Sequence, residues 1–198
     1  KLKNGKMRSF LADILSDELG CGDSNKAHPN LYDDFLMSIG VGKDNLDSIA
    51  LKNNIKLLDD ARTMLVNGSD AYGIGLRGMG GECVCQVYIS LLHEYLTMNP
   101  YVVKNKDKID WTFWDLHVGE HDVRHREETR DLINQEIVLQ NGHALHQLGK
   151  AYGESMRSWE SFWNNIFHAT VDAQPHTQSA VVEVQSQLDF HALVAQKA

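Results

Sequence analysis

The sequence is poor in proline and cysteine, with three of each in 198 residues. So few prolines leave long helices uninterrupted, because proline inside a helix removes a hydrogen bond and clashes with the preceding turn. Three cysteines exclude a disulfide framework and indicate a reducing compartment, for which we expect the cytoplasm. No apolar stretch approaches the roughly 18 residues of a membrane span, and no signal-peptide pattern precedes the first helix, so we expect a soluble protein.

Positive charge is also scarce. Lys and Arg number 19 against 27 Asp and Glu, which gives a formal net charge of −8. This balance argues against a nucleic-acid-binding surface. The chain is long enough for one domain with a full-sized core.

Apolar residues recur at helical spacing along most of the chain, and no convincing strand pattern interrupts them. Glycine, proline or a capping residue bounds each segment. The sequence predicts a single all-α domain over residues 1–198, a bundle of about six to seven helices. The expected helices are residues 7–19, 29–39, 44–68, 70–99, 107–141 and 143–168, followed by a linker and a terminal helix within residues 169–198.

Five glycines crowd into residues 72–82, where Gly73, Gly75 and Gly78 spell G-x-G-x-x-G. That pattern binds a dinucleotide only between a strand and a helix, and no strand precedes it here. Each glycine costs a helix interior about 1 kcal/mol relative to alanine. The run therefore indicates a place where backbones approach closely or space is kept open, just before Glu82.

Histidine is abundant, with ten in the chain. His117, His121 and His125 are spaced by four and share one slowly drifting helix face, where several nitrogen ligands could surround a metal ion. For this stretch taken alone, a solvated charged face is the alternative.

Glu18 ends the first expected helix, His28 begins the second, and Glu82 lies on an otherwise apolar helix. Helical bundles hold di-metal sites in which Glu and His project inward from several helices. Taken singly, Glu18 is equally an exposed acid and His28 a helix cap. Glu82 is harder to explain without a partner, because an unpaired buried carboxylate is costly.

Several segments together resemble one family. Glu18-Leu-Gly-Cys-Gly-Asp followed by His28-Pro-Asn-Leu-Tyr-Asp-Asp-Phe and Ser38-Ile-Gly-Val resembles the helix-loop-helix signature of the heme-oxygenase-like di-iron oxidases, also called iron-containing redox enzymes. Glu82 after its small-residue run and the aromatic lead into His117 match the next two signatures. Trp159-Glu-Ser-Phe-Trp163 resembles a segment near the family's C-terminus, so the resemblance covers residues 7–168.

The resemblance implies a heme-oxygenase-like bundle that holds two Fe(II) ions and uses O₂ as co-substrate. Helices generally precede the Glu18 region in this family, and some supply a further carboxylate, so an additional ligand outside the printed sequence stays open. The implied iron ligands are Glu18, His28, Glu82, His117, Asp122 and His125.

The last three ligands depart from the family spacing, because His117 lies five residues before Asp122 instead of four. Five residues on an ideal helix turn Asp122 away from His117. A π-bulge near Gly119 would absorb the extra residue, and we prefer this interpretation. The alternative is an unbroken helix in which His121 replaces Asp122 as ligand.

The Glu18-x9-His28 spacing looks most like the branch of the family that oxygenates amine nitrogen. The resemblance therefore implies a biosynthetic oxidoreductase that N-oxygenates or oxidatively cleaves a small amine or amino acid, with an external electron donor and a homodimer as further possibilities. Arg77, about one turn before Glu82, is a candidate for binding a substrate carboxylate bidentately. The alternatives are a metal-free helical small-molecule-binding protein and a thiaminase-like hydrolase of the same fold with Cys83 or Cys85 as nucleophile.

Overall fold

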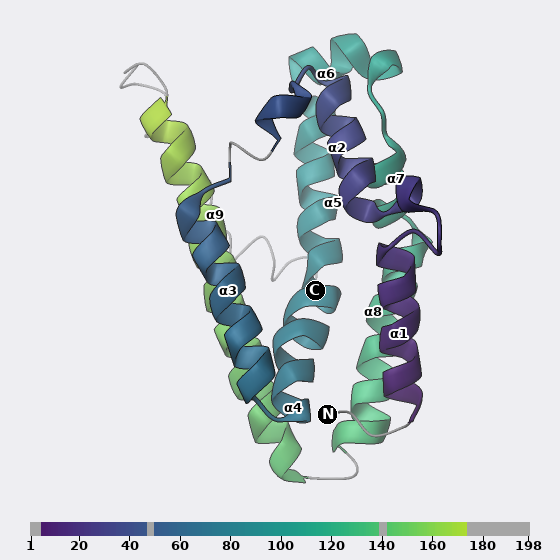
Figure 1. The fold of residues 1–198 in the computed structure, drawn as a ribbon, viewed down its shortest axis with the longest axis vertical. Helices are drawn as coiled ribbons and strands as arrows, with labels where there is room; N and C mark the ends of the chain where they lie inside the picture. Colours follow the sequence, from purple (N-terminus) through teal and green to yellow (C-terminus); the bar gives the residue numbers. More distant parts are fainter. Residues whose placement is uncertain (1–4, 47–49, 139–141, 174–198) are drawn as a thin grey trace.

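The computed structural model describes residues 5–46, 50–138 and 142–173 (Figure 1). Every regular element among these residues is a helix, which confirms the all-α prediction. None of the helices in this part of the chain is both long enough and apolar enough to cross a membrane.

A continuous helical rod occupies the centre of the fold. It consists of α4 (Asp70–Gly73), a π-helix (Ile74–Glu82) and α5 (Cys83–Met98). The π-helix coincides with the glycine run, so the expected helix over residues 70–99 is present but has a wider turn in its first half. The rod places Glu82 at the junction between the π-helix and α5.

Other helices surround this rod on two sides (Figure 1). On one side α9 (Gly142–Ala173) packs on the π-helix, and α3 (Lys52–Asn67) packs on α9. On the other side lie α8 (Glu120–Leu132) and α1 (Lys6–Glu18). Next to α5 lies α7 (Thr112–Val118), with α2 (His28–Ser38) against it, and α6 (Pro100–Asn105) follows α5.

The number of helices is slightly larger than expected. If α4, the π-helix and α5 count as one rod, the described residues contain eight α-helical elements instead of six or seven. The first addition is α6, which Asn99 caps by accepting hydrogen bonds from the backbone N–H groups of Tyr101 and Val102. The second arises because the helix expected over residues 107–141 is divided at Gly119.

Three expected boundaries differ from the structure. Lys43–Asn45 forms only a short 3₁₀ turn, so α3 begins at Lys52 instead of Asp44. Helix α7 begins at Thr112, whose backbone N–H donates to the side chain of Asp110, instead of near residue 107. Helix α9 continues to Ala173, through the start of the expected linker, and the expected terminal helix at residues 180–198 lies outside the described residues.

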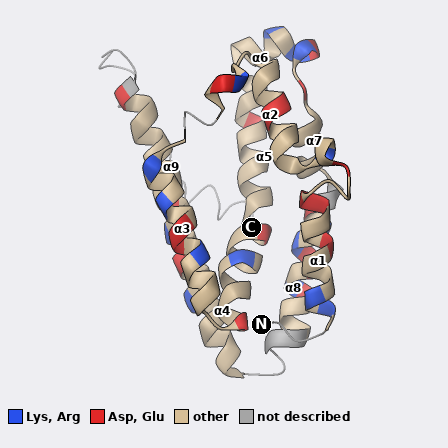
Figure 2. Cartoon of the chain, in the orientation of Figure 1, with Lys and Arg blue, Asp and Glu red and all other residues tan. Residues whose placement is uncertain are grey.

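Apolar side chains gather in two clusters along the rod. The first combines Met7, Ile74, Ile133 and Leu148, and the second combines Phe35, Val102, Ile109 and Trp114. Charged residues are frequent on the helices around the rod, whereas α5 is almost free of Lys, Arg, Asp and Glu (Figure 2).

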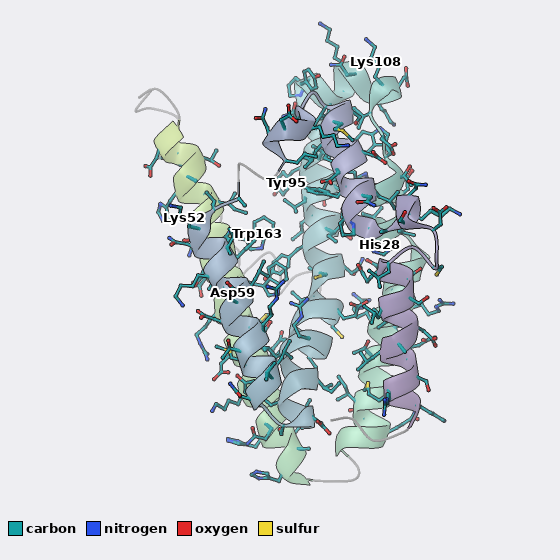
Figure 3. The ribbon with its side chains drawn as sticks, in the orientation of Figure 1. His28, Lys52, Asp59, Tyr95, Lys108 and Trp163 are labelled. Atoms are coloured by element: carbon teal, nitrogen blue, oxygen red, sulfur yellow. The ribbon has the colours of Figure 1, made fainter. Side chains whose placement is uncertain are left out.

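Aromatic side chains join α9 to α5. Tyr88 of α5 packs against Trp159 and Trp163 of α9, with ring centroids 5.1 and 5.8 Å apart. Figure 3 shows Trp163 directed toward α5, whereas Lys52 and Asp59 extend from the outer face of α3.

The glycine run permits very close packing between the π-helix and α9. A Cβ atom built on Gly75 would lie 2.5 Å from the carbonyl oxygen of Leu148, and one on Gly80 would lie 2.3 Å from the Cβ of Ser155. Both distances are too short for any side chain. The expectation that these glycines allow a close approach of backbones is therefore correct at Gly75, whereas the space at Gly80 admits the side chain of Ser155.

Candidate metal centre

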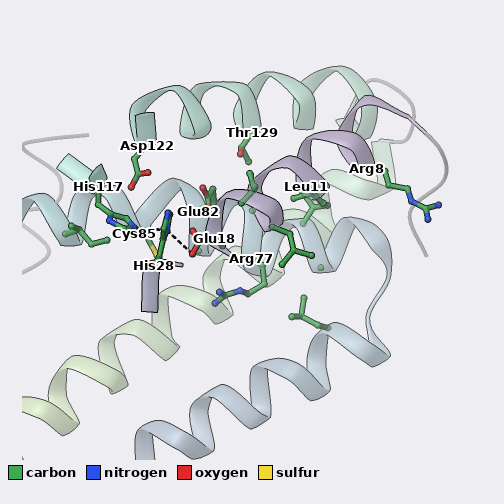
Figure 4. Close-up of a pocket in the computed structure, with 18 of the residues that line it drawn as sticks. Arg8, Leu11, Glu18, His28, Arg77, Glu82, Cys85, His117, Asp122 and Thr129 are labelled. Carbon is green, nitrogen blue, oxygen red and sulfur yellow. Dashed lines mark hydrogen bonds and ion pairs between the residues drawn. The ribbon is translucent and has the colours of Figure 1, made fainter. Parts of the chain in front are cut away.

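A cavity of about 1110 Å³ runs between the rod and the helices α1, α2, α7 and α8. Carboxylates and histidines line one end, and the remaining wall is mostly apolar (Figure 4). Five of the six expected ligands line this cavity, namely Glu18, His28, Glu82, His117 and Asp122. His125 joins them through a contact with Glu82.

Glu18, His28 and His117 form the tightest group. Nδ1 of His28 lies 3.1 Å from Oε2 of Glu18 and 3.2 Å from Nε2 of His117. One potential ligand atom from each residue lies within 4.8 Å of the others. The hydrogen bond from His28 lowers the pKa of Glu18, and the same contact with Glu18 raises the pKa of His28.

A sharp turn between α1 and α2 brings Glu18 and His28 together. Gly20 has a φ of +80°, and a Cβ atom there would lie only 2.2 Å from the carbonyl oxygen of Asp23. Only glycine fits both the backbone angle and the space. Pro29 then occupies the first turn of α2, where a missing N–H costs nothing.

The ring of His117 is held by its own helix. Its Nδ1 lies 2.7 Å from the carbonyl oxygen of Phe113, one turn earlier. Because a carbonyl oxygen only accepts hydrogen bonds, Nδ1 carries the proton, and Nε2 of the neutral ring keeps its lone pair toward His28. Metal-binding histidines are commonly oriented by such a contact behind the ring.

Glu82 and His125 form a second group, with Oε1 of Glu82 lying 3.3 Å from Nδ1 of His125. Burial raises the pKa of Glu82 to about 7, and the negative charges of Glu18 and Asp122 contribute in the same direction. Glu82 is thus close enough to the other two carboxylates to be repelled by both, and a bound cation would relieve this repulsion.

Asp122 reaches the cavity in a way that differs from the expected π-bulge. Helix α7 ends at Val118, Gly119 has an extended backbone with ψ of −174°, and α8 begins at Glu120. The helix is therefore interrupted at Gly119, and the interruption changes the register of Asp122 relative to His117. The prediction of a π-bulge here is wrong in form, although Asp122 does line the cavity (Figure 4). The side chain of His121 lies outside the described part of the chain.

Arg77 enters the same cavity from the π-helix (Figure 4). A Cβ atom on Gly81 would lie 3.5 Å from the guanidinium carbon of Arg77, which is ordinary van der Waals contact, so the guanidinium lies beside Gly81. Arg77 lies five residues before Glu82, and the i→i+5 pattern of a π-helix brings such a pair toward one face.

Cys83 and Cys85 are partly buried thiols. Burial raises the pKa of Cys83 to about 11 and that of Cys85 to about 12. Both groups are protonated at neutral pH, although the nucleophilic form of cysteine is the thiolate.

Two side chains of α9 support the site without having been assigned a role from the sequence. The hydroxyl of Ser155 and the indole N–H of Trp159 both donate to the carbonyl oxygen of Gly80, each at 2.7 Å. The spacing of Ser155 and Trp159 by four residues marked a shared helix face, but nothing in the sequence linked that face to the glycine run.

Comparison with known proteins identifies the family. A family model described as iron-containing redox enzyme matches residues 1–152. The match stops before Trp159-Glu-Ser-Phe-Trp163, so the resemblance of that segment is not tested by it. No curated protein and no solved structure matches the chain. Since the match covers well over half of the 198 residues, the chain belongs to the iron-containing redox enzymes, a family of oxidoreductases.

Proposed function

We propose that this chain is a non-heme di-iron enzyme that uses O₂ to oxidise a small substrate. The observation that carries the proposal is the convergence of three carboxylates and three imidazoles at one end of a large cavity. This donor set suits Fe(II), because it combines charge-balancing oxygen ligands with neutral nitrogen ligands. In this proposal the described helices form one domain around the centre.

Each group of residues has a distinct part in the proposal. Glu18, His28 and His117 would hold one ion, and Glu82 with His125 would hold the other. The charge of Asp122 acts on both His28 and Glu82, which supports a place for Asp122 among the ligands. When bound, Fe(II) supplies electrons and open coordination positions for O₂. The electrons for repeated turnovers would come from an external donor.

The protein side chains prepare the site for this chemistry. Phe113 fixes the tautomer of His117, so that Nε2 needs no proton transfer before it binds a cation. Glu82 binds a cation as the carboxylate, and because burial raises its pKa to about 7, binding releases a proton from the fraction that is still protonated near neutral pH. The apolar wall, which includes Leu11, Ile74 and Ile89, limits water near the centre.

We propose Arg77 as the anchor for a substrate carboxylate, which favours an amino acid over a simple amine. Among the described residues Arg77 forms neither an ion pair nor a hydrogen bond, so its five N–H donors are not engaged by them. An arginine–carboxylate pair is commonly bidentate and adds about 1.5–3 kcal/mol, or roughly ten- to a hundredfold in affinity. Oxygenation of an amine nitrogen or oxidative cleavage would then take place near the anchored end.

The anchor is testable with three probes of equal chain length, hexanoate, norleucine and hexylamine. Isothermal titration of the iron-free chain should show that Arg77→Ala weakens hexanoate and norleucine at least tenfold and leaves hexylamine unchanged. Arg157→Ala is the matched control, because Arg157 shares with Arg77 a second cavity of about 410 Å³ but does not line the metal-bearing one. If Arg77→Ala binds each of the three probes as tightly as Arg157→Ala does, Arg77 does not anchor the substrate carboxylate.

Two other functions remain as alternatives. A metal-free small-molecule-binding protein would use the same cavity but would gain nothing from iron. A thiaminase-like hydrolase would need Cys83 or Cys85 as a thiolate, and the raised pKa of each thiol disfavours this function. Three free cysteines are compatible with a reducing compartment, and we keep the cytoplasm as a proposal.

Metal stoichiometry of single variants tests the assignment of the ligands. Under anaerobic conditions, the wild type should bind two Fe(II) per chain, and Glu82→Ala or His125→Ala should lose one ion and the O₂-dependent activity. His28→Ala should remove the other. Activity that is retained in iron-free protein would favour an alternative function.

A further inference from the structure

The carbonyl oxygen of Gly80 in the π-helix accepts two hydrogen bonds from side chains of another helix. Ser155 Oγ and Trp159 Nε1, both on α9, donate to it at 2.7 Å each. Ser155 is 6% exposed, and the missing side chain of Gly80 is what lets it approach so closely. Two side chains from another helix thus converge on one backbone oxygen, two residues before Glu82.

This contact bears on the direction of Glu82 because Glu82 lies at the junction between a π-helix, which is a rare structure, and the α-helix α5. Hydrogen bonds run from i to i+5 in a π-helix and from i to i+4 in α5, so the junction at Glu82 needs support from outside the rod. A five-glycine segment supplies little of that support itself. If the segment returned to an α-helix, each residue would turn the chain by about 100°, which is more than in the wider π-helix, so Glu82 would point in another direction relative to α4.

We propose that Ser155 and Trp159 are positioning residues of the metal centre. Through Gly80 they hold the π-helical register that directs Glu82 toward His125 and into the cavity. The inference rests on the proposed function in one respect, which is that Glu82 binds a metal ion. Neither Ser155 nor Trp159 touches the ligands. In this proposal they affect the metal centre only by holding the register of the rod.

Trp163 provides a matched control on the same helix. It lies one turn after Trp159 and packs against the same ring of Tyr88. Its indole N–H has no hydrogen-bond partner among the described residues, whereas that of Trp159 is bound to Gly80. Phenylalanine at either position keeps most of the aromatic packing, so the two variants differ mainly in the bond to Gly80.

The test is an anaerobic titration with Co(II), followed by its visible absorption, on the full chain. We expect the double variant Ser155→Ala, Trp159→Phe to bind one of the two ions at least tenfold more weakly. The ion held by Glu18, His28 and His117 should be unaffected, because α9 does not form that group. Trp163→Phe should bind both ions as the wild type does.

Selective loss of one ion in the double variant separates positioning from general destabilisation. General destabilisation would weaken the binding of both ions, and Trp163→Phe would show it with an equal fall in melting temperature. The inference is overturned if the double variant binds both ions normally, or if Trp163→Phe reproduces its effect.

Hydrogen exchange of the backbone amides in residues 74–85 measures the register without any metal. We expect faster exchange there in the double variant than in Trp163→Phe. If the wild type binds no Co(II) but this difference in exchange is found, the proposed function fails while the register control stands. If exchange is the same in both variants, the inference fails whatever the metal content.

Discussion

Nδ1 of His117 lies 2.7 Å from the carbonyl oxygen of Phe113, and this contact decides which nitrogen of the ring can bind a metal ion. We expect the neutral ring to carry its proton on Nδ1 in the metal-free chain. Nitrogen-15 chemical shifts of the His117 ring measure this directly, and addition of Zn(II) should shift Nε2 most. A protonated Nε2 in the metal-free chain at pH 8 would contradict the orientation given to His117.

Glu82→Gln should stabilise the metal-free chain at high pH. The raised pKa of Glu82, from 4.5 to about 7, means that its stabilising contribution is fully present below pH 4.5 and lost as the pH rises through about 7. The uncharged glutamine avoids this loss, so the variant should gain about 1–3 kcal/mol at pH 8 and little at pH 4.5. Urea unfolding at the two pH values measures the difference.

The same substitution should cost the chain its metal affinity, since the amide is a poor ligand compared with a carboxylate. A gain in stability at pH 8 together with a loss of metal binding is typical of a residue that serves function at the expense of stability. Equal unfolding free energies of wild type and Glu82→Gln at pH 8 would show that the carboxyl is not destabilising.

The thiols of Cys83 and Cys85 should react slowly with iodoacetamide. At pH 8 roughly one Cys83 in a thousand is a thiolate, because burial raises its pKa to about 11. Exposed Cys21 is the internal control and should be labelled first, as peptide mass spectrometry would show. The double variant Cys83→Ser, Cys85→Ser should retain O₂-dependent activity, whereas complete loss of activity with bound iron intact would support the thiol enzyme.

The turn before α2 offers a further paired test at Gly20 and Gly22, which both have positive φ. A Cβ on Gly22 meets nothing within 4 Å, so Gly22→Ala should cost about 1–2 kcal/mol of unfolding free energy from the backbone angle alone. Gly20→Ala should cost a further 1–3 kcal/mol, because its Cβ would collide with Asp23. It should also weaken the metal site that includes Glu18 and His28, which Gly22→Ala should leave intact.

Helix boundaries were predicted correctly where a residue at the boundary itself, such as a proline or a glycine, determines where the helix begins or ends. Pro29 marked the start of α2, and Gly40, with a φ of +98°, marked its end. The start of α3 was misplaced because Asp44 resembles a helix cap but belongs to a 3₁₀ turn. A short polar stretch supports either structure, and only packing against the rest of the chain selects one.

The two irregular helices show why spacing alone was insufficient at the site. The five-residue spacing of His117 and Asp122 indicated that the helix is irregular between them. The irregularity is an interruption of the helix at Gly119 and not a π-bulge. One π-helix formed at Ile133–Val138, after α8, and another formed in the glycine run, where α9 approaches at Gly75 and Gly80. That contact joins residues about 75 positions apart, which no local pattern reports.

The central claim is that the chain holds two iron ions that react with O₂, and an anaerobic Fe(II) titration of the wild type followed by exposure to O₂ tests it most directly. We predict saturation at two Fe(II) per chain and an absorbance change that appears only when O₂ is added, accelerated by an amino acid that fits the cavity. A chain that binds no Fe(II) under these conditions and shows no O₂-dependent absorbance change would contradict the claim.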